Sequence, residues 1–254
     1  MKKLFVLIAI LAVSVPVVLL AGCRMTTIRA SGVMVEGEFA LSRQVTEIRF
    51  AFPARLNIDN SNNNLLTYYV DDNLQEHLNI RLSNTGVLTD ELARRIGVNM
   101  TNSRGAVFNV GAAGLRYLRL SGAAVAVASG NFSAGNNFEL SLSGASQARG
   151  FDVTAQDVRV TLSGASRVED SEFEAGRNLR VDVSGASRFT ASGEANSLII
   201  NASGASNVQA GELTAVSGNV RASGASNVTV SVSGNLNQST SGGSRITNIG
   251  CLVC

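Results

Sequence analysis

A four-residue motif, Ser-Gly-Ala-Ser or a close variant of it, occurs seven times between residues 121 and 244 of the 254-residue chain, at intervals of 18 to 22 residues. The first serine of each copy is Ser121, Ser143, Ser163, Ser184, Ser203, Ser223 or Ser241. A period of about 20 residues is typical of repeat architectures, in which each unit buries its apolar face only against its neighbours. This repeat constrains the fold more than any other feature of the sequence.

Apolar residues keep fixed distances from each motif serine. The residues three and one positions before it are mostly apolar and the residue between them is mostly polar, as in Leu140-Ser141-Leu142. An apolar residue returns five positions after the serine. Alternation with a period of two indicates strands with one buried face. We therefore predict an all-β fold: a single-stranded, right-handed parallel β-helix (a β-solenoid) of about 20 residues per coil, with its motif-bearing coils at 115–248.

The motif itself predicts a tight corner between the two strands of each coil. Glycine tolerates the positive φ that such a corner needs, and the serines can bond to backbone groups at the turn and to the serines of adjacent coils. A catalytic serine is not indicated, because no histidine follows His77 and no Gly-x-Ser-x-Gly motif occurs. The predicted structural corner ladder consists of Ser121, Gly122, Ser143, Gly144, Ser163, Gly164, Ser184, Gly185, Ser203, Gly204, Ser223 and Gly224.

The last copy of the repeat differs from the others. Gln238 and Thr240 stand at positions that are apolar in most other coils. An open end would expose apolar surface and unpaired strand edges, so a polar final coil is expected where a solenoid stops. This composition predicts a terminal cap and argues against open-ended stacking of copies.

Residues 35–88 lack the motif but contain alternating runs. We predict strands within 45–59, with a break at Pro53, and at 65–70 and 77–82; these longer strands would begin the solenoid and cap its N-terminal end. Thr89 as an N-cap, acidic residues after it and Gly97 as a stop predict a short helix over 89–97, followed by a loop over 98–114. The solenoid domain is predicted at 35–250, after a tether at 23–34 and before a Cys-x-x-Cys tail at 251–254.

The first 22 residues predict a lipoprotein signal peptide. Lys2 and Lys3 precede an apolar run over 4–20. The sequence Leu-Ala-Gly-Cys that ends at Cys23 resembles the bacterial lipobox, which implies that Cys23 is lipidated and that its acyl chains anchor the protein to a membrane. A plain signal peptide or an uncleaved anchor helix are the alternatives. The residue after Cys23 is not aspartate, which favours the outer membrane; the sequence leaves open whether the domain faces the periplasm or the exterior.

Two further cysteines, Cys251 and Cys254, form a Cys-x-x-Cys pair. In an oxidising envelope a disulfide is favoured over a redox or zinc site, because the sequence has no second cysteine pair and no histidine cluster. Asp59, Asp71 and Asp72 do not have the spacing of an EF-hand loop. We predict no metal site and no cofactor.

The charge balance argues against nucleic acid as a partner. The chain has 21 Lys and Arg residues, of which Lys2 and Lys3 lie in the predicted signal peptide, and 19 Asp and Glu residues. Binding to a nucleic-acid backbone needs a surplus of basic residues. A nearly neutral mature domain lacks that surplus.

Leading strands followed by the runs LRLSGAA, LSLSGAS, VTLSGAS, VDVSGAS, INASGAS and VRASGAS are similar to the head GIN domain family of adhesin-like bacterial envelope proteins. The resemblance covers about 35–250. It implies a cell-envelope protein with one right-handed β-helical domain behind an N-terminal signal or lipobox. It also implies no catalytic residues, so the family supplies no site residues to assign here.

The anchor and the resemblance favour a non-enzymatic, adhesin-like or binding solenoid whose partner is a glycan or a surface protein. One alternative is a periplasmic structural or oligomeric scaffold. Another is a polysaccharide-active enzyme, which is less favoured because acidic residues are not expected to recur at matched positions on adjacent coils. The outward-facing charges that could contact a ligand are Arg159, Arg167, Arg180, Arg188, Glu139, Asp182 and Glu169.

Overall fold

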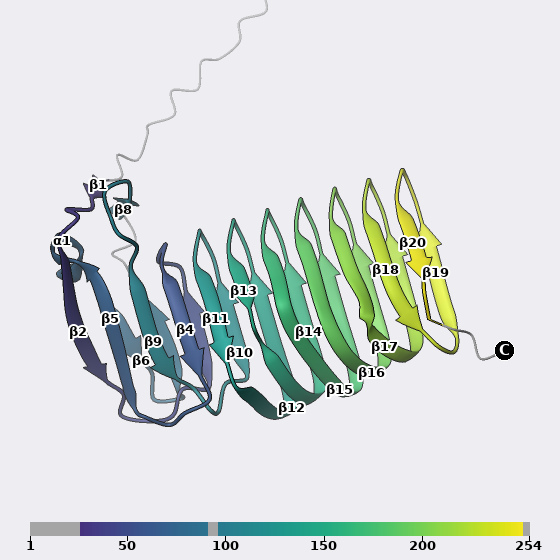
Figure 1. The fold of residues 1–254 in the computed structure, drawn as a ribbon, viewed down its shortest axis with the longest axis horizontal. Helices are drawn as coiled ribbons and strands as arrows, with labels where there is room; N and C mark the ends of the chain where they lie inside the picture. Colours follow the sequence, from purple (N-terminus) through teal and green to yellow (C-terminus); the bar gives the residue numbers. More distant parts are fainter. Residues whose placement is uncertain (1–25, 91–95, 251–254) are drawn as a thin grey trace, which may run out of the picture.

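The computed structural model describes residues 26–90 and 96–250. The chain is a right-handed β-solenoid of about seven turns with about 20 residues per coil (Figure 1). The coils stack along the long axis of the molecule, and the antiparallel pair of residues 34–40 and 65–71 covers the N-terminal end. These strands are shorter than the bent strands of the central coils, so the expectation of longer strands at this end is wrong. In the described part of the chain, no helix is long and apolar enough to cross a membrane. The predicted all-β solenoid is confirmed.

The N-terminal elements mix parallel and antiparallel pairing. Strands β2, β5 and β9 pair antiparallel in that order, and β9 then pairs parallel with β4, where the solenoid begins. The elements are β1 (Thr26–Arg29), β2 (Met34–Ala40), β3 (Glu47–Phe50), β4 (Arg55–Asp59), β5 (Leu65–Asp71), α1 (Asp72–Gln75), β6 (Ile80–Leu82), β7 (Val87–Asp90), β8 (Ile96–Asn99) and β9 (Val107–Gly111).

All strand pairings among the motif-bearing coils are parallel. Several of these strands bend and so contribute to more than one face of the solenoid. They are β10 (Tyr117–Leu120), β11 (Val125–Ser129), β12 (Asn131–Leu142), β13 (Gln147–Arg149), β14 (Asp152–Leu162), β15 (Arg167–Val183), β16 (Arg188–Ala202), β17 (Asn207–Ala222), β18 (Asn227–Val232), β19 (Leu236–Thr240) and β20 (Arg245–Asn248).

Each coil has three faces, which we name by their order along the chain. The pre-corner face carries the strand that ends at the motif serine, such as residues 139–142. The post-corner face carries the strand that follows the motif, such as 147–149. The return face carries the next strand, such as 152–155, which leads back to the pre-corner face of the following coil. Equivalent residues of successive coils lie about 4.8 Å apart across parallel strands.

The core consists of apolar side chains that stack from coil to coil. Phe132, Phe151, Phe173 and Phe189 are fully buried, and the rings of Phe173 and Phe189 stack with centroids 6.1 Å apart. Burial of each such side chain contributes roughly 1.5–3 kcal/mol. The pre-corner face adds an aliphatic column, in register from coil to coil: Leu118, Leu140, Val160, Val181, Ile200 and Val220.

The corners form a continuous backbone ladder. Each motif glycine has φ between 65° and 75°. From the second motif onward, the N–H of the residue after the glycine donates to the glycine carbonyl of the preceding coil at 2.7–2.8 Å. A Cβ atom on Gly164 would lie 2.6 Å from the Gly144 carbonyl oxygen. The corner therefore needs glycine both for its φ and for the close approach of the next coil.

The second serine of the motif is buried, whereas the first is half-buried. Its hydroxyl bonds mainly to backbone carbonyls: the Ser226 Oγ donates to Ser223 O at 2.6 Å, and the Ser146 Oγ to Ser143 O at 2.9 Å. The buried column is Ser146, Ser166, Ser187, Ser206 and Ser226. Serine-to-serine bonding is minor, with one contact of 3.4 Å between Ser166 and Ser187 among the described residues.

The helix predicted over 89–97 is wrong where the structure describes it. Thr89 lies in β7, opposite Arg49 of β3 on one side and Arg81 of β6 on the other. Ile96 and Gly97 belong to β8. Strand pairing on both sides of β7 outweighs the local capping signals, which are worth only about 1 kcal/mol. Residues 91–95 lie outside the described part.

The segment predicted as a tether is partly folded. β1 (Thr26–Arg29) pairs parallel with β8. Two carboxylates hold the chain that follows it: the Gly32 N–H donates to Asp71 at 2.7 Å, and the Ser31 hydroxyl donates to Asp72 at 2.6 Å. The ordered fold therefore begins before the predicted boundary at Val35.

Two other N-terminal predictions need correction. The loop predicted over 98–114 contains β9, where Phe108 and Val110 are buried in alternation. The strand predicted over 77–82 is shorter, because His77 lies in the turn after α1 and the strand spans only Ile80–Leu82. The strands predicted within 45–59 and at 65–70 are present as β3, β4 and β5.

The C-terminal coil is polar and exposed. Gln238 and Thr240 of β19 are open to solvent at positions that are buried in the preceding coils. The Asn248 side chain accepts from the Val232 N–H at 2.9 Å and donates to the Val232 carbonyl at 3.0 Å. This amide supplies hydrogen-bond partners to the backbone at the end of β18, where another strand would otherwise pair.

Candidate binding surface

Charged side chains on the pre-corner face pair with one another. Arg159 and Arg180 both contact Asp182, at N–O distances of 3.4 and 2.8 Å. Burial acts to raise the pKa of Asp182, but hydrogen bonds from Arg180 and Asn201 and the charge of Arg159 outweigh it, so that pKa is lowered. Two of the four arginines expected to face a ligand therefore already share one carboxylate.

The first coils continue this pattern. Glu47 contacts Arg49 at 2.6 Å and Arg119 at 3.7 Å, and Arg119 also reaches Glu139 at 3.6 Å. The hydrogen bond to Glu47 raises the pKa of Arg49. Exposed pairs of this kind contribute at most about 1 kcal/mol each. Most charges of the pre-corner face are thus engaged with one another at a solvated surface.

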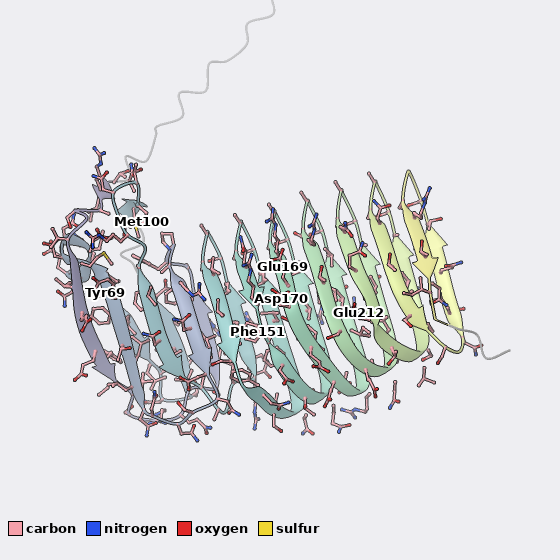
Figure 2. The ribbon with its side chains drawn as sticks, in the orientation of Figure 1. Tyr69, Met100, Phe151, Glu169, Asp170 and Glu212 are labelled. Atoms are coloured by element: carbon pink, nitrogen blue, oxygen red, sulfur yellow. The ribbon has the colours of Figure 1, made fainter. Side chains whose placement is uncertain are left out.

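The post-corner face carries the other two predicted arginines. Arg167 and Arg188 are direct neighbours on adjacent coils and both are exposed. Neither forms an ion pair with a described residue, whereas Arg149 pairs with Glu169 at 2.9 Å. Figure 2 labels Glu169 over the central coils. This face thus holds a small excess of positive charge.

The return face carries acidic side chains and no basic ones in its described residues. Asp152 lies beside Glu172, and Glu174 lies beside Glu194, on adjacent coils. These four carboxylates and Glu212, which Figure 2 labels over a later coil, have no ion-pair partner among the described residues. The expectation that acidic residues do not recur at matched positions is therefore wrong.

An open groove follows the bend between the return face and the pre-corner face. Its volume is about 670 Å³, and it crosses successive coils from Ser133 to Ser233. Hydroxyl, amide and carboxylate groups line it, and the amide of Asn196 donates to the Gly176 carbonyl along its floor. The lining residues on the return face are Ser133, Thr154, Glu174, Glu194, Thr214 and Ser233. A groove of this shape suits an extended ligand.

The carboxylates of the groove do not have the setting of a glycosidase pair. A general acid needs a pKa raised by burial, but Glu174 and Glu194 are both exposed. Among the described carboxyl groups, burial raises the pKa of Asp90 to about 6, against the backbone N–H groups that lower it. Those donors are Ala51 at 2.8 Å and Phe52 at 2.5 Å. Asp90, at the end of β7, thus caps the corner between β3 and β4, which stacks against the first motif corner.

The residues predicted as site candidates have separate places. The corner serines and glycines form one row along the solenoid. Its first members, Ser121, Gly122 and Ser143, line an open cavity of about 790 Å³ near Asp90. Cys23, Cys251 and Cys254 lie outside the described residues. Asp59 accepts from the Ser61 N–H at 2.9 Å, which stabilises a turn. Within 26–90 and 96–250, no three His, Cys, Asp or Glu residues are grouped so that they could hold a metal ion.

The comparisons with solved structures concern the fold. A "Putative lipid binding protein" from Parabacteroides distasonis is similar, with a TM-score of 0.73 and 15% identity over 88% of this chain and 100% of that one. A "putative adhesin" from the same species has a TM-score of 0.71 and 18% identity over 88% of this chain and 98% of that one. A "putative adhesin" from Bacteroides fragilis has a TM-score of 0.61 and 14% identity over 87% and 100%. No curated protein matches the chain.

The comparison with family models concerns the sequence. The model described as "Putative auto-transporter adhesin, head GIN domain" matches residues 45–251, which include all seven corner motifs. The predicted resemblance is confirmed. With a match over more than half of its length, this chain belongs to the head GIN domain family.

Proposed function

We propose that this protein is a non-enzymatic, adhesin-like binding module that a lipid anchor holds in the bacterial cell envelope. The observation that carries the proposal is the open polar groove along the return face. The description of the family and the names of the similar structures support an adhesin-like role and an envelope or surface location. The repeated coils support it too, because a rigid solenoid presents one binding element per coil to a long ligand.

The ligand that fits the groove is an extended polymer of neutral or positive charge. Glu174 and Glu194 are exposed within it, and its described lining includes no basic residue that could neutralise an anionic polymer. Aromatic rings for stacking on sugars are also absent from the described lining. Hydrogen bonds from the hydroxyl, amide and carboxylate groups would therefore supply the contacts.

A binding role is favoured over catalysis by the setting of the charged groups. The pre-corner carboxylates are held in ion pairs, and those of the return face are exposed to water. Asp90, with its raised pKa, bonds to the backbone of the corner between β3 and β4. None of these described groups pairs a buried acid with a base, as hydrolysis of a polysaccharide requires.

The binding proposal is tested by blocking the groove. Thr154→Arg with Thr214→Arg places two long side chains in it, whereas Thr190→Arg with Thr229→Arg makes the same change on the post-corner face. Cells that produce each variant are applied to immobilised glucan (neutral), chitosan (cationic) and alginate (anionic). We expect retention on glucan or chitosan that the groove variant loses and the control variant keeps. Equal retention of both variants, or retention on alginate alone, would contradict the proposal.

The lipid anchor has a test of its own. No lysine follows Lys3 in the sequence, so a chain that is cleaved before Cys23 and acylated on its new amine has no free amine. We expect the mature protein to resist an amine-reactive dye after denaturation. The Cys23→Ser variant, which keeps Lys2 and Lys3, should react. Equal labelling of the two proteins would exclude N-acylation at Cys23.

A further inference from the structure

The post-corner sheet has two free edges at opposite ends of the molecule. Among the described strands, β2 pairs only with β5, and β20 pairs only with β18. Figure 1 shows β2 at the N-terminal end and β20 at the C-terminal end of the stack. Free edges of this kind present backbone donors and acceptors to a further strand.

The two edge strands run in the same direction. β2 is antiparallel to β5, and β5 is antiparallel to β9, so β2 is parallel to β9. Every later pairing across this face, from β9 through β4 and β11 to β20, is parallel. A second copy shifted along the solenoid axis would therefore bring its β2 beside β20 as one more parallel strand.

The free backbone groups of β2 belong to its even-numbered residues. The Asp72 N–H donates to Val33 O, and the Leu41 N–H donates to Asn64 O. Bonding to one neighbour alternates along a strand, so the odd-numbered residues of β2 bond to β5. The N–H and C=O groups of Glu36 and Glu38 consequently point to the free edge.

The free backbone groups of β20 are complementary to these. The N–H of Arg245 donates to Ser226 O and that of Ile249 to Val230 O, so the odd-numbered residues bond to β18. The even-numbered residues, including Ile246, point to the free edge. In a parallel pair, a residue bonds to the two neighbours of the residue that lies opposite it. The even-numbered residues of β2, which have free backbone groups, therefore lie opposite the odd-numbered residues of β20. This parity places Glu36 or Glu38 opposite Arg245.

The side chains favour the same alignment of the two strands as the backbone does. Glu36, Glu38 and Arg245 are exposed on the outer side of the sheet, and none has an ion-pair partner among the described residues. Residues 213–250 contain two arginines and no acidic residue. On the inner side, the half-buried Phe39 of β2 and Ile246 of β20 would cover each other. Two β2 edges would oppose glutamates to each other, so like ends are disfavoured.

We propose that a second copy of this chain docks end to end, with β2 of one copy extending the sheet beside β20 of the other. The contact is heterologous, so it repeats and builds a row of solenoids. It goes beyond the binding function proposed above and does not depend on it. The polar final coil, which the sequence suggested would prevent stacking, leaves the β20 edge open in the described residues.

Charge reversal tests this contact on the full-length protein extracted in detergent. Glu36→Arg with Glu38→Arg makes both ends basic, and Arg245→Glu makes both ends acidic. Each variant alone should associate about tenfold more weakly than the wild type in sedimentation, because it loses up to two surface pairs and places like charges opposite each other. A mixture of the two variants should recover association, since each end then meets its opposite. Arg188→Glu, away from both edges, should change nothing.

A disulfide experiment locates the contact. Chains with Glu38→Cys and chains with Thr247→Cys carry different tags and are produced together, and the unsubstituted chain reports the background from Cys251 and Cys254. We expect cross-links between the two tagged chains. Monomers at every concentration, a mixture of charge variants that fails to recover, or cross-links only between two Glu38→Cys chains would overturn the proposal.

Discussion

The motif glycine satisfies two constraints at each corner. Gly164 has φ +75°, which a residue with a Cβ adopts only under strain, and it also touches the carbonyl of Gly144 in the coil before it. The two constraints are independent, because one is local and the other depends on the stack. Their coincidence at every corner explains why the glycine recurs when the neighbouring apolar positions vary.

Replacing this glycine should destabilise the solenoid. Gly164→Ala would force a Cβ atom to within 2.6 Å of a backbone oxygen at a positive φ, and we expect a loss of roughly 1–3 kcal/mol. Gly176→Ala is the matched control, because its Cβ would meet only the flexible side chain of Gln156, at 3.0 Å, and its φ is not positive. The denaturant concentration at the unfolding midpoint, measured for both variants, should be lower for Gly164→Ala. Equal midpoints would show that the corner relaxes to accommodate the Cβ atom.

The buried serine column offers a second comparison at this scale. Ser226 donates to Ser223 O at 2.6 Å, whereas the buried Oγ of Ser206 has no hydrogen-bond partner. We expect Ser226→Ala to cost about 1 kcal/mol, and Ser206→Ala to be neutral or stabilising, since it removes an unpaired buried hydroxyl. Thermal unfolding of the two variants measures the difference. A larger loss from Ser206→Ala would contradict this reading of the column.

At the scale of elements, the corner between β3 and β4 needs an acceptor for its first two N–H groups. Asp90 provides this at the end of β7, by accepting the N–H groups of Ala51 and Phe52 with its carboxylate. Burial raises its pKa from 3.8 to about 6. The folded state therefore holds the proton of Asp90 more tightly than the unfolded state does.

This shift predicts the pH dependence of stability. Between about pH 4 and pH 6 the folded state binds more protons at Asp90, so this group's contribution to stability falls as pH rises, by up to about 3 kcal/mol. Asp90→Asn keeps an acceptor for the two N–H groups and removes the titration. We expect the variant to lose this part of the pH dependence when unfolding is compared at pH 4 and pH 7. An identical dependence in the two proteins would exclude Asp90 as its source.

The coils could be predicted from the sequence because each one repeats the same alternation and the same corner. The N-terminal elements could not, because the pairing that makes β7 and β9 strands joins segments far apart in the chain. Local signals at Thr89 favoured a helix, and no local signal reports the pairing of β7 with β3. The strand break at Pro53 could be predicted, since proline lacks a backbone N–H and interrupts an alternating run.

The acidic return face was only partly visible in the sequence. Asp152 and Glu172 both follow their motif serine by nine residues, so their proximity could have been predicted. Glu174 lies 11 residues after its motif serine, whereas Glu194 lies 10 residues after its own. A register shift in the pairing of β15 with β16 accounts for the difference. Irregularities of this kind can be located only when the strands are seen paired.

At the scale of the whole molecule, the three faces differ in charge. On the pre-corner face most charges are held in ion pairs, the post-corner face carries free arginines, and the return face carries free carboxylates beside the groove. This separation is independent of the nearly neutral total charge of the sequence. It gives a rod with a distinct surface for a ligand and two ends of opposite charge.

The central claim, that this domain is an anchored binding module able to meet ligands outside the cell, is tested most directly by its exposure on intact cells. Asn227→Cys places a thiol on an exposed position of the post-corner face. A maleimide that cannot cross membranes is applied to intact and to permeabilised cells, with the unsubstituted protein as the background from its own cysteines. The account predicts equal labelling of Asn227→Cys in both; labelling only after permeabilisation would place the domain inside the envelope and contradict the adhesin-like role.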